Sequence, residues 1–124
     1  MKNFKVGKEI KSILASQDDT YLSELENKIF PLIAQANTTF PFMVYRRAAY
    51  RPASTKDGIG EIVTVDISIA TPNYEDGVNI ADAAATALVG KETNLIQDIT
   101  LTSVGEDYIE DTFIQTFTID IELK

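Results

Sequence analysis

The chain concentrates all of its arginines in one short stretch. Arg46, Arg47 and Arg51 lie within six positions, in the sequence "FPFMVYRRAAYRP" that begins at Phe40. A guanidinium group can bind a carboxylate through two parallel hydrogen bonds and can stack on an aromatic ring. Arginine and tyrosine are also enriched among the residues that dominate protein–protein interfaces. The stretch therefore indicates one of two things: local ion pairs on a solvated strand, or a surface that contacts another protein.

Carboxylates cluster near the C-terminus, in the sequence "GEDYIED". This segment contains Glu106, Asp107, Glu110 and Asp111, which raises the question of a calcium site. An EF-hand loop carries its oxygen ligands at alternating positions around a central glycine and closes with a glutamate. The spacing here does not fit that pattern, so it favours a solvated turn.

Two further patterns also fall short of a catalytic or binding motif. Asp66 and Asp120 lie on the polar faces of alternating strands, where charged side chains normally meet solvent, and this does not favour an acid–base pair. The sequence "TKDGIG" lacks the spacing of a phosphate-binding loop. Its Asp57–Gly58 step instead predicts the turn of a β-hairpin.

Composition narrows the chemistry further. The chain has no cysteine and no histidine, so it lacks thiolates and the commonest general base and metal ligand. Residues 1–56 hold nine basic against five acidic side chains, whereas residues 57–124 hold two against fourteen. The net charge of −8 argues against nucleic-acid binding, which needs a positive surface. We expect no catalytic site, no cofactor and no bound metal.

Length and hydropathy bound the organisation of the chain. A chain of 124 residues has the length of one domain, and we expect a single domain over residues 1–124. No apolar run approaches the roughly 18 residues of a membrane span, so we also expect no membrane association.

The N-terminal third predicts one amphipathic helix and a short extended segment. Across residues 4–16, four apolar residues recur at helical spacing: Val6, Ile10, Ile13 and Leu14. The sequence "YLSELENK" predicts one further helical turn. In "KIFPLIA", Pro31 indicates an edge position, because proline cannot donate a hydrogen bond to a sheet.

The arginine-bearing segment predicts a strand, because aromatic and β-branched residues dominate the preceding "FMVY". On a regular strand, successive side chains point to opposite faces. We therefore expect Arg46 and Tyr50 on one face of this strand. Tyr45, Arg47 and Arg51 are expected on the other.

The rest of the chain predicts a strand, a helix and a final pair of strands. "EIVTVDISIAT" alternates strictly, with an apolar face of Val63, Val65, Ile67 and Ile69. Residues 74–90 predict a helix that Asn73 caps and Gly90 ends. Residues 95–124 predict two strands around a turn at "GED", residues 105–107. The sequence therefore predicts an α+β fold, in which an antiparallel sheet of two long hairpins carries two packed helices.

The order of these segments resembles a known family. The pieces "KIFPLIAQANTTFPFMVYRR", "TKDGIGEIVTVDISIATPNYEDGVNIADAAATAL" and "DYIEDTFIQTFTIDIEL" resemble the tail-terminator or tail-completion proteins of long-tailed phages and prophages. The shared features are an I-Y/F-P-L piece, a strand ending in V-Y-R, an alternating strand ending near Y-E, an alanine-rich helix and a closing Y-x-x-x-hydrophobic-Q strand. The resemblance covers roughly residues 28–121.

The resemblance implies a non-enzymatic α+β subunit that assembles into a homo-oligomeric ring, often a hexamer, at the head-proximal end of the tail tube. The ring would stop tube polymerisation and dock to the head. The implied partners are further copies of the chain, the tail tube protein and the head-completion or connector protein. The implied location is the virion tail, after assembly in the cytoplasm of the bacterial host. We expect no sequence-specific nucleic acid and no membrane among the partners.

The candidate interface residues combine the arginine strand, the turn that follows it and the acidic last hairpin. They are Tyr45, Arg46, Arg47, Arg51, Lys56, Asp57, Glu110 and Asp111. The "VYRR" strand and Lys56–Asp57 follow from the resemblance. The acidic half of the chain offers the arginines a complementary surface on a neighbouring copy.

Three alternatives stay open from the residues alone. A head–tail joining, or neck, protein would show the same chemistry. A small-molecule or peptide-binding α+β domain would have a deep apolar pocket between helix 74–90 and the sheet, although the alanines of that helix favour close packing. An enzyme that used carboxylates and arginine would show a carboxyl group with a strongly raised pKa in a cleft.

Overall fold

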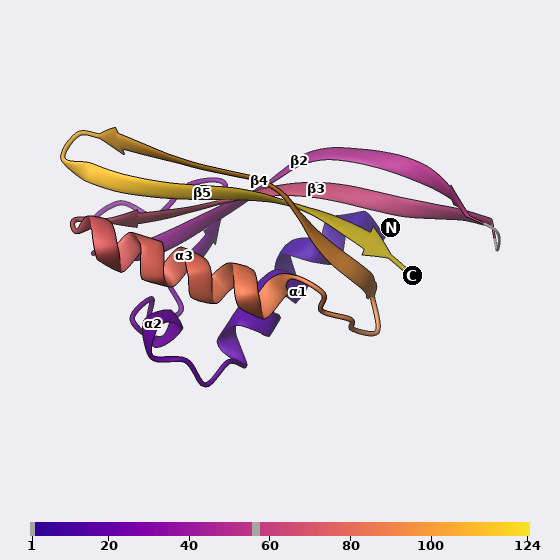
Figure 1. Ribbon diagram of the computed structural model, residues 1–124, viewed down its shortest axis with the longest axis horizontal. Helices are drawn as coiled ribbons and strands as arrows, with labels where there is room; N and C mark the ends of the chain where they lie inside the picture. The colour runs from indigo at the N-terminus through magenta and orange to yellow at the C-terminus, as the bar shows by residue number, and fades with distance from the viewer. Residues whose placement is uncertain (1, 56–57) are drawn as a thin grey trace.

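The computed structural model describes residues 2–55 and 58–124, which form a β-sheet layer with a helical layer on one of its faces (Figure 1). The five strands have the spatial order β1-β2-β3-β5-β4. Their bounds are β1 (Ile29–Pro31), β2 (Phe42–Thr55), β3 (Gly58–Thr71), β4 (Ile96–Ile109) and β5 (Thr112–Leu123). The helices are the 3₁₀ turn η1 (Lys2–Lys5) and the α-helices α1 (Val6–Ala15), α2 (Thr20–Ser23) and α3 (Tyr74–Leu88). This arrangement confirms the predicted α+β fold.

The helices form where the sequence predicts them. All four apolar residues of the N-terminal pattern are buried on α1. Helix α3 is capped at its start by Asn73, whose side-chain Oδ1 accepts a hydrogen bond from the Asp76 amide at 3.3 Å. Its C-terminal end is followed by Gly90 at φ +78°, a conformation that glycine adopts without strain. The Gly90 amide donates to the Ile99 carbonyl at 2.8 Å, which ties the end of α3 to β4. None of the helices of the described residues is long and apolar enough to cross a bilayer.

The two long hairpins are antiparallel, and β3 and β5 join them at the centre of the sheet. Strand β2 pairs with β3, β3 with β5, and β5 with β4, all antiparallel. Strand β1 pairs in parallel with β2 at one edge, through Ile29 to Pro31 only. The edge position predicted from Pro31 is therefore confirmed. The apolar face predicted for β3 is confirmed as well, because its four residues are all 1% exposed or less.

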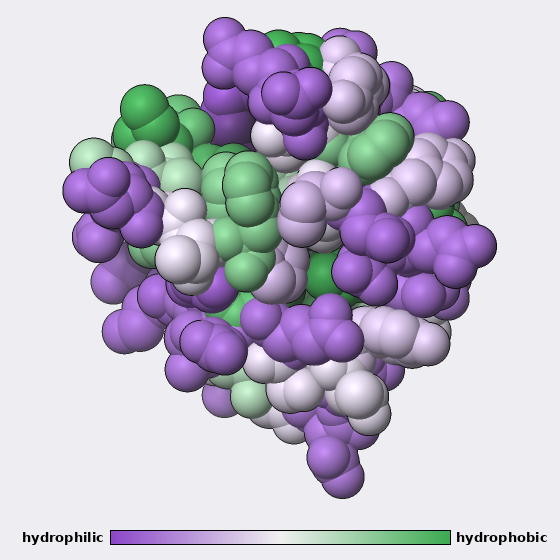
Figure 2. Space-filling view, turned by 90° about the vertical axis from the view of Figure 1, so that its left-hand side faces the viewer, coloured by the Kyte–Doolittle hydropathy of each residue, from purple (hydrophilic) through white to green (hydrophobic). Residues whose placement is uncertain are grey.

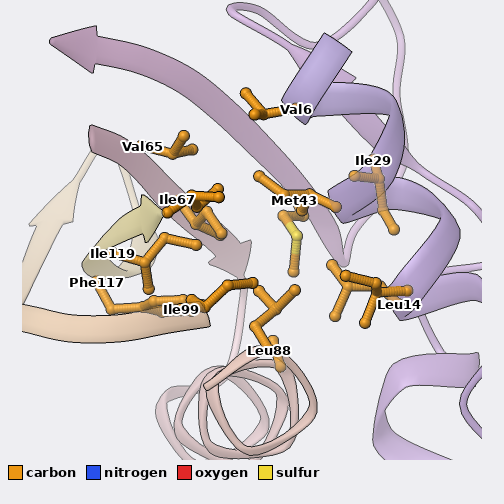
Figure 3. Packing of buried hydrophobic residues seen from close by; sticks show 14 of the residues in the cluster. Val6, Leu14, Ile29, Met43, Val65, Ile67, Leu88, Ile99, Phe117 and Ile119 are labelled. Atoms are coloured by element: carbon orange, nitrogen blue, oxygen red, sulfur yellow. The ribbon is translucent and has the colours of Figure 1, made fainter. Parts of the chain in front are cut away.

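The core lies between the sheet and the helices. Figure 3 shows apolar side chains from both layers pointing toward one another, with Met43 of β2 between α1 and the central strands. Helix α3 contributes Ile80, Ala84 and Leu88, all 0% exposed. Each fully buried Ile or Leu side chain contributes roughly 1.5–3 kcal/mol of hydrophobic stabilisation. The small residues of α3 let this helix lie close against β3 and β5.

The turn predicted at residues 105–107 is wrong. Strand β4 continues through that segment to Ile109, which pairs with Thr112 of β5. The chain turns at Glu110 and Asp111, whose φ angles are +51° and +61°. A two-residue hairpin connection with two positive φ angles is the type I′ pattern, whose twist matches that of the strands. Gly105 suggested the turn, but it lies in β4.

The other predicted turn, at Asp57–Gly58, falls partly outside the described residues. Thr55 pairs with Gly58, so Gly58 belongs to β3 rather than to the connection. The two residues between them are Lys56 and Asp57, which lie outside the described residues. These two candidate interface residues therefore have no structural description.

Candidate interaction surface

A β-bulge divides the arginine strand into two parts. Arg47 pairs with Val65 and Ala49 pairs with Thr64, which leaves Ala48 as an extra residue in β2. An inserted residue reverses the alternation of the side chains that follow it. The prediction that Arg51 shares a face with Arg47 is therefore wrong, as is the one that Tyr50 shares a face with Arg46.

Arg46 and Arg51 lie on the outer face, the face of the sheet that points away from the helices. Arg46 Nη2 is 2.8 Å from Asp66 Oδ2, on the neighbouring strand β3. Arg51 Nη2 is 3.2 Å from Asp120 Oδ2, on β5 of the final hairpin. The arginine side chains are 59% and 55% exposed. Exposed ion pairs of this kind contribute about 0–1 kcal/mol, so they do little to hold the fold together.

Each of these two aspartates also accepts a hydrogen bond from a threonine on the neighbouring strand. Thr118 donates to Asp66 Oδ1 at 2.8 Å, and Thr64 donates to Asp120 Oδ1 at 2.7 Å. Although β3 and β5 are neighbours, each aspartate bonds an arginine and a threonine instead of the other carboxylate. The geometry is that of two ion pairs on a polar surface, and it offers no acid–base dyad.

Arg47 lies on the helix-side face, over the N-terminal turn. Its guanidinium carbon is 4.5 Å from the centroid of the Phe4 ring, a cation–π arrangement. Its Nη1 donates to the carbonyl and the side-chain oxygen of Asn3, both at 3.5 Å. Tyr45 lies on the same face and packs against the core, and its ring is so close to Gly7 that an added Cβ would meet its Cε2 at 2.6 Å. The Tyr45 side chain therefore packs against helix α1.

An open groove of about 460 Å³ follows these residues along the helix-side face of β2. Tyr50 lines it and donates its hydroxyl to Glu61 Oε1 at 3.0 Å. This hydrogen bond to a carboxylate is the main reason that the pKa of Tyr50 lies above its usual value. The groove is open, about half of its lining is polar, and none of its lining residues comes from α3, where the apolar pocket of a small-molecule site was expected.

An aromatic cluster that sequence reasoning missed lies beside the Glu110–Asp111 turn. The Phe113 ring centroid is 5.7 Å from that of Tyr74 and 4.7 Å from that of Tyr108. Glu106 accepts hydrogen bonds from the Tyr74 hydroxyl at 2.7 Å and from Gln115 Nε2 at 3.0 Å. These bonds, that of Tyr74 first, lower the pKa of Glu106, and the same contact raises the pKa of Tyr74.

Exposed apolar side chains also gather at this end of the molecule. Figure 2 views the molecule from this end and shows a hydrophobic area bordered by hydrophilic residues. On the outer face, Phe40 and Phe42 stack at 5.6 Å. They line a groove of about 270 Å³ with Ile109 and Ile114. Phe40 is 44% and Ile109 50% exposed, which is typical of a surface that meets another protein.

The acidic residues of the last hairpin occupy the opposite edge of the sheet from the arginines. Glu110 and Asp111 form its turn and are exposed, and Asp107 precedes them on β4. Within one chain, β3 and β5 separate this edge from β2. The structure therefore brings Arg51 to the final hairpin only through Asp120, and it does not bring the arginines to Glu110 or Asp111. Among residues 2–55 and 58–124, no three acidic side chains converge as a metal site would require.

Comparisons with known proteins agree with this architecture. Residues 12–123 match the family model described as Tail completion protein gp17. Among solved structures, 27 chains match. One of them comes from a structure described as the virion of a native gene transfer agent particle. It has a TM-score of 0.76 at 13% identity, over 92% of this chain and 90% of that one. At this identity the match shows a shared fold. A search of curated proteins finds no match.

Proposed function

Because the chain belongs to the tail completion protein gp17 family, which is structural and non-enzymatic, we propose that it forms a homo-oligomeric ring that ends the phage tail tube. In this role it stops tube polymerisation and joins the tail to the head connector. The observation that carries the proposal is the family match over residues 12–123. Its partners are further copies of the chain, the tail tube protein and the connector protein. Its place is the head-proximal end of the virion tail.

The surface of the subunit supports this role. The three arginines lie on β2, and Asp98, Glu106, Asp107, Glu110 and Asp111 lie on β4 and its turn at the other edge of the sheet, so these two edges of one copy and the next carry complementary charges. A contact between two unlike surfaces closes into a ring when the rotation between copies is right. Arg46, Arg47, Arg51, Glu110 and Asp111 are the described residues that we assign to subunit or tail contacts.

Deletion of the gene tests the function directly. In the phage or prophage that encodes the chain, we expect deletion to give tails of irregular, excessive length without heads, as seen by electron microscopy. Expression of the wild-type gene in trans should restore complete particles. Tails of normal length that stay separate from heads would point to a neck protein instead. Complete particles without the gene would contradict both roles.

A further inference from the structure

Two strands of the sheet leave long stretches of their outer edges without a partner among the described residues. Strand β1 pairs with β2 only at Met43, Val44 and Tyr45, so the edge of β2 is open from Arg46 onward. Strand β4 is the last strand of the sheet. The amides of Gly90 and Thr93 bond the carbonyls of Ile99 and Ile96 near its start, so among the described residues its outer edge is open from Thr100 to Ile109. An open edge presents unpaired N–H and C=O groups that can accept another strand.

We propose that the open edge of β2 in one copy pairs with the open edge of β4 in the next copy, which continues the sheet across the subunit boundary. This inference rests on the proposed ring and names the surfaces that build it. Strand β5 runs parallel to β2, since both are antiparallel to β3, and β4 runs antiparallel to β5. A second copy placed beside the first in the same orientation therefore brings its β2 antiparallel to β4. Antiparallel pairing is the commoner arrangement of adjacent strands.

The two edges carry opposite charges. Residues 46–55 of β2 contain three arginines and no acidic residue. Residues 96–111, which comprise β4 and its turn, contain five acidic residues and no basic one. Arg46 and Arg51 contact their own aspartates through Nη2. A guanidinium has five N–H donors, so each arginine can also serve an acceptor on a neighbouring copy.

The short strand β1 sets where the pairing must end. It occupies the position next to Tyr45, so a strand added to β2 has to stop at Arg46. Strand β4 ends at Ile109, before the turn. When these two ends are placed side by side, Ile109 lies opposite Arg46. With Ala48 bulged out of the ladder, Asp107 then lies opposite Ala49.

This register also matches the two faces of the strands. Ala49 pairs with Thr64 on the outer face, and Asp107 pairs with Ile114 on the same face. Asp107 would then lie diagonally between Arg46 and Arg51. On the helix-side face, the register brings Tyr108 opposite Arg47. The neighbouring copy is displaced along the strands, as a sheet that closes on itself requires.

Disulfide trapping tests the pairing, because the chain contains no cysteine. Two single variants with tags of different size, Ala49→Cys and Asp107→Cys, are mixed at high protein concentration and oxidised. A disulfide needs Cα atoms about 4.4–6.8 Å apart, a distance that directly opposed strands provide. Both sites are exposed, and circular dichroism checks that both variants fold. We expect a cross-linked heterodimer.

The matched control is Thr100→Cys mixed with Ala49→Cys. Thr100 is also exposed on the outer face of β4, and it lies in the same cross-strand row as Ala49, Thr64 and Asp120. It would be the partner of Ala49 if the copies met without displacement. We expect severalfold more heterodimer with Asp107→Cys than with Thr100→Cys. A preference for Thr100→Cys, or equal yields, would overturn the register.

No heterodimer with either variant would overturn strand pairing. The bulge at Ala48 and Pro52 would then act as devices that keep the β2 edge from pairing. This failure is distinguishable from failure of the proposed function, which the tails of the deletion strain report. Defective tails without trapping mean that the ring uses another surface. Trapping with normal tails means that the strands pair for another purpose.

Discussion

At the scale of single residues, the clearest electrostatic feature is the Glu106 carboxylate. Its pKa is lowered because Tyr74 and Gln115 donate hydrogen bonds to the charged form. Removal of the Tyr74 hydroxyl should therefore raise the pKa of Glu106. We expect this rise in the Tyr74→Phe variant, measured by NMR titration of the glutamate side chains. Tyr50→Phe removes a comparable hydroxyl from Glu61 and should leave the pKa of Glu106 unchanged.

The same carboxylate makes stability depend on pH in a defined window. The pKa of Glu106 is lower in the folded state than in the unfolded state, where 4.5 is the usual value. The charged Glu106 side chain therefore stabilises the protein fully above the unfolded pKa, and this contribution is lost as pH falls through the folded pKa. Glu106→Gln should thus be less stable than wild type at pH 7, and the two should converge as pH falls below 4.5 and through the folded pKa. Urea unfolding across this range tests it. A difference that stays constant with pH would show that Glu106 acts through packing rather than charge.

Gly77 of α3 shows how a packed contact can reverse a general rule. Glycine to alanine in an exposed helix normally adds about 0.5–1 kcal/mol of stability. Here a Cβ would lie 2.8 Å from Thr71 Oγ1, whose side chain is 0% exposed and donates to the Asn73 carbonyl. We expect Gly77→Ala to cost about 1–3 kcal/mol in urea unfolding. Gly105→Ala, with open space around its Cβ, should change stability little. A stabilised Gly77→Ala would contradict this account.

At the scale of the elements, the turn of the last hairpin is strained by its residue types. Glu110 and Asp111 both have positive φ, which costs L-residues about 1–2 kcal/mol each. Asn followed by Gly is the preferred type I′ pair, so Glu110→Asn combined with Asp111→Gly is expected to raise the unfolding free energy by about 1 kcal/mol. Thermal and urea unfolding measure the change, and Asp111→Gly alone should supply most of it. A loss of stability would mean that the carboxylates hold the turn.

The elements also show what the sequence can and cannot predict. The alternation in β3 and the cap at Asn73 depend on nearby residues, and these predictions are confirmed. The bulge at Ala48 depends on how β2 meets β3, and nothing in "RRAAY" indicates it. The Tyr74–Glu106 bond joins residues that are 32 apart, so only the tertiary fold reveals it. The faces of Tyr50 and Arg51 were therefore mispredicted although the strand was identified correctly.

At the scale of the whole molecule, the uneven charge of the chain becomes a property of two sheet edges. The sequence shows nine basic residues in its first 56 and fourteen acidic residues in the remainder. The strand order then places β2 and β4 on opposite sides of the sheet. The basic and acidic halves of the sequence could also pair with each other within one subunit, and the Arg51–Asp120 ion pair is such a contact. What the sequence could not supply is the strand order that leaves both edges open.

Assembly should therefore respond to salt and to the loss of two arginines. Screening shortens the reach of charge from about 10 Å at 0.1 M salt to 3 Å at 1 M. In light scattering at high protein concentration, we expect a ring-sized species of the wild type to dissociate as salt rises. Arg46→Ala combined with Arg47→Ala should remain monomeric. It should cost about 2 kcal/mol of stability, since it removes one exposed ion pair, one cation–π contact and the long hydrogen bonds from Arg47 to Asn3.

The control for this double variant removes the same charge elsewhere. Lys11 and Lys91 are exposed and lie outside β2 and β4, so Lys11→Ala with Lys91→Ala should assemble as the wild type does. If the arginine variant unfolds, its residues are structural, through Asp66 and Phe4 in particular. If it folds and still assembles like the wild type, the arginines lie outside the subunit contact. The association is assigned to the basic edge of β2 only if the arginine variant is a folded monomer while the lysine control assembles. This result would show that assembly depends on where the charges lie rather than on the net charge of the chain.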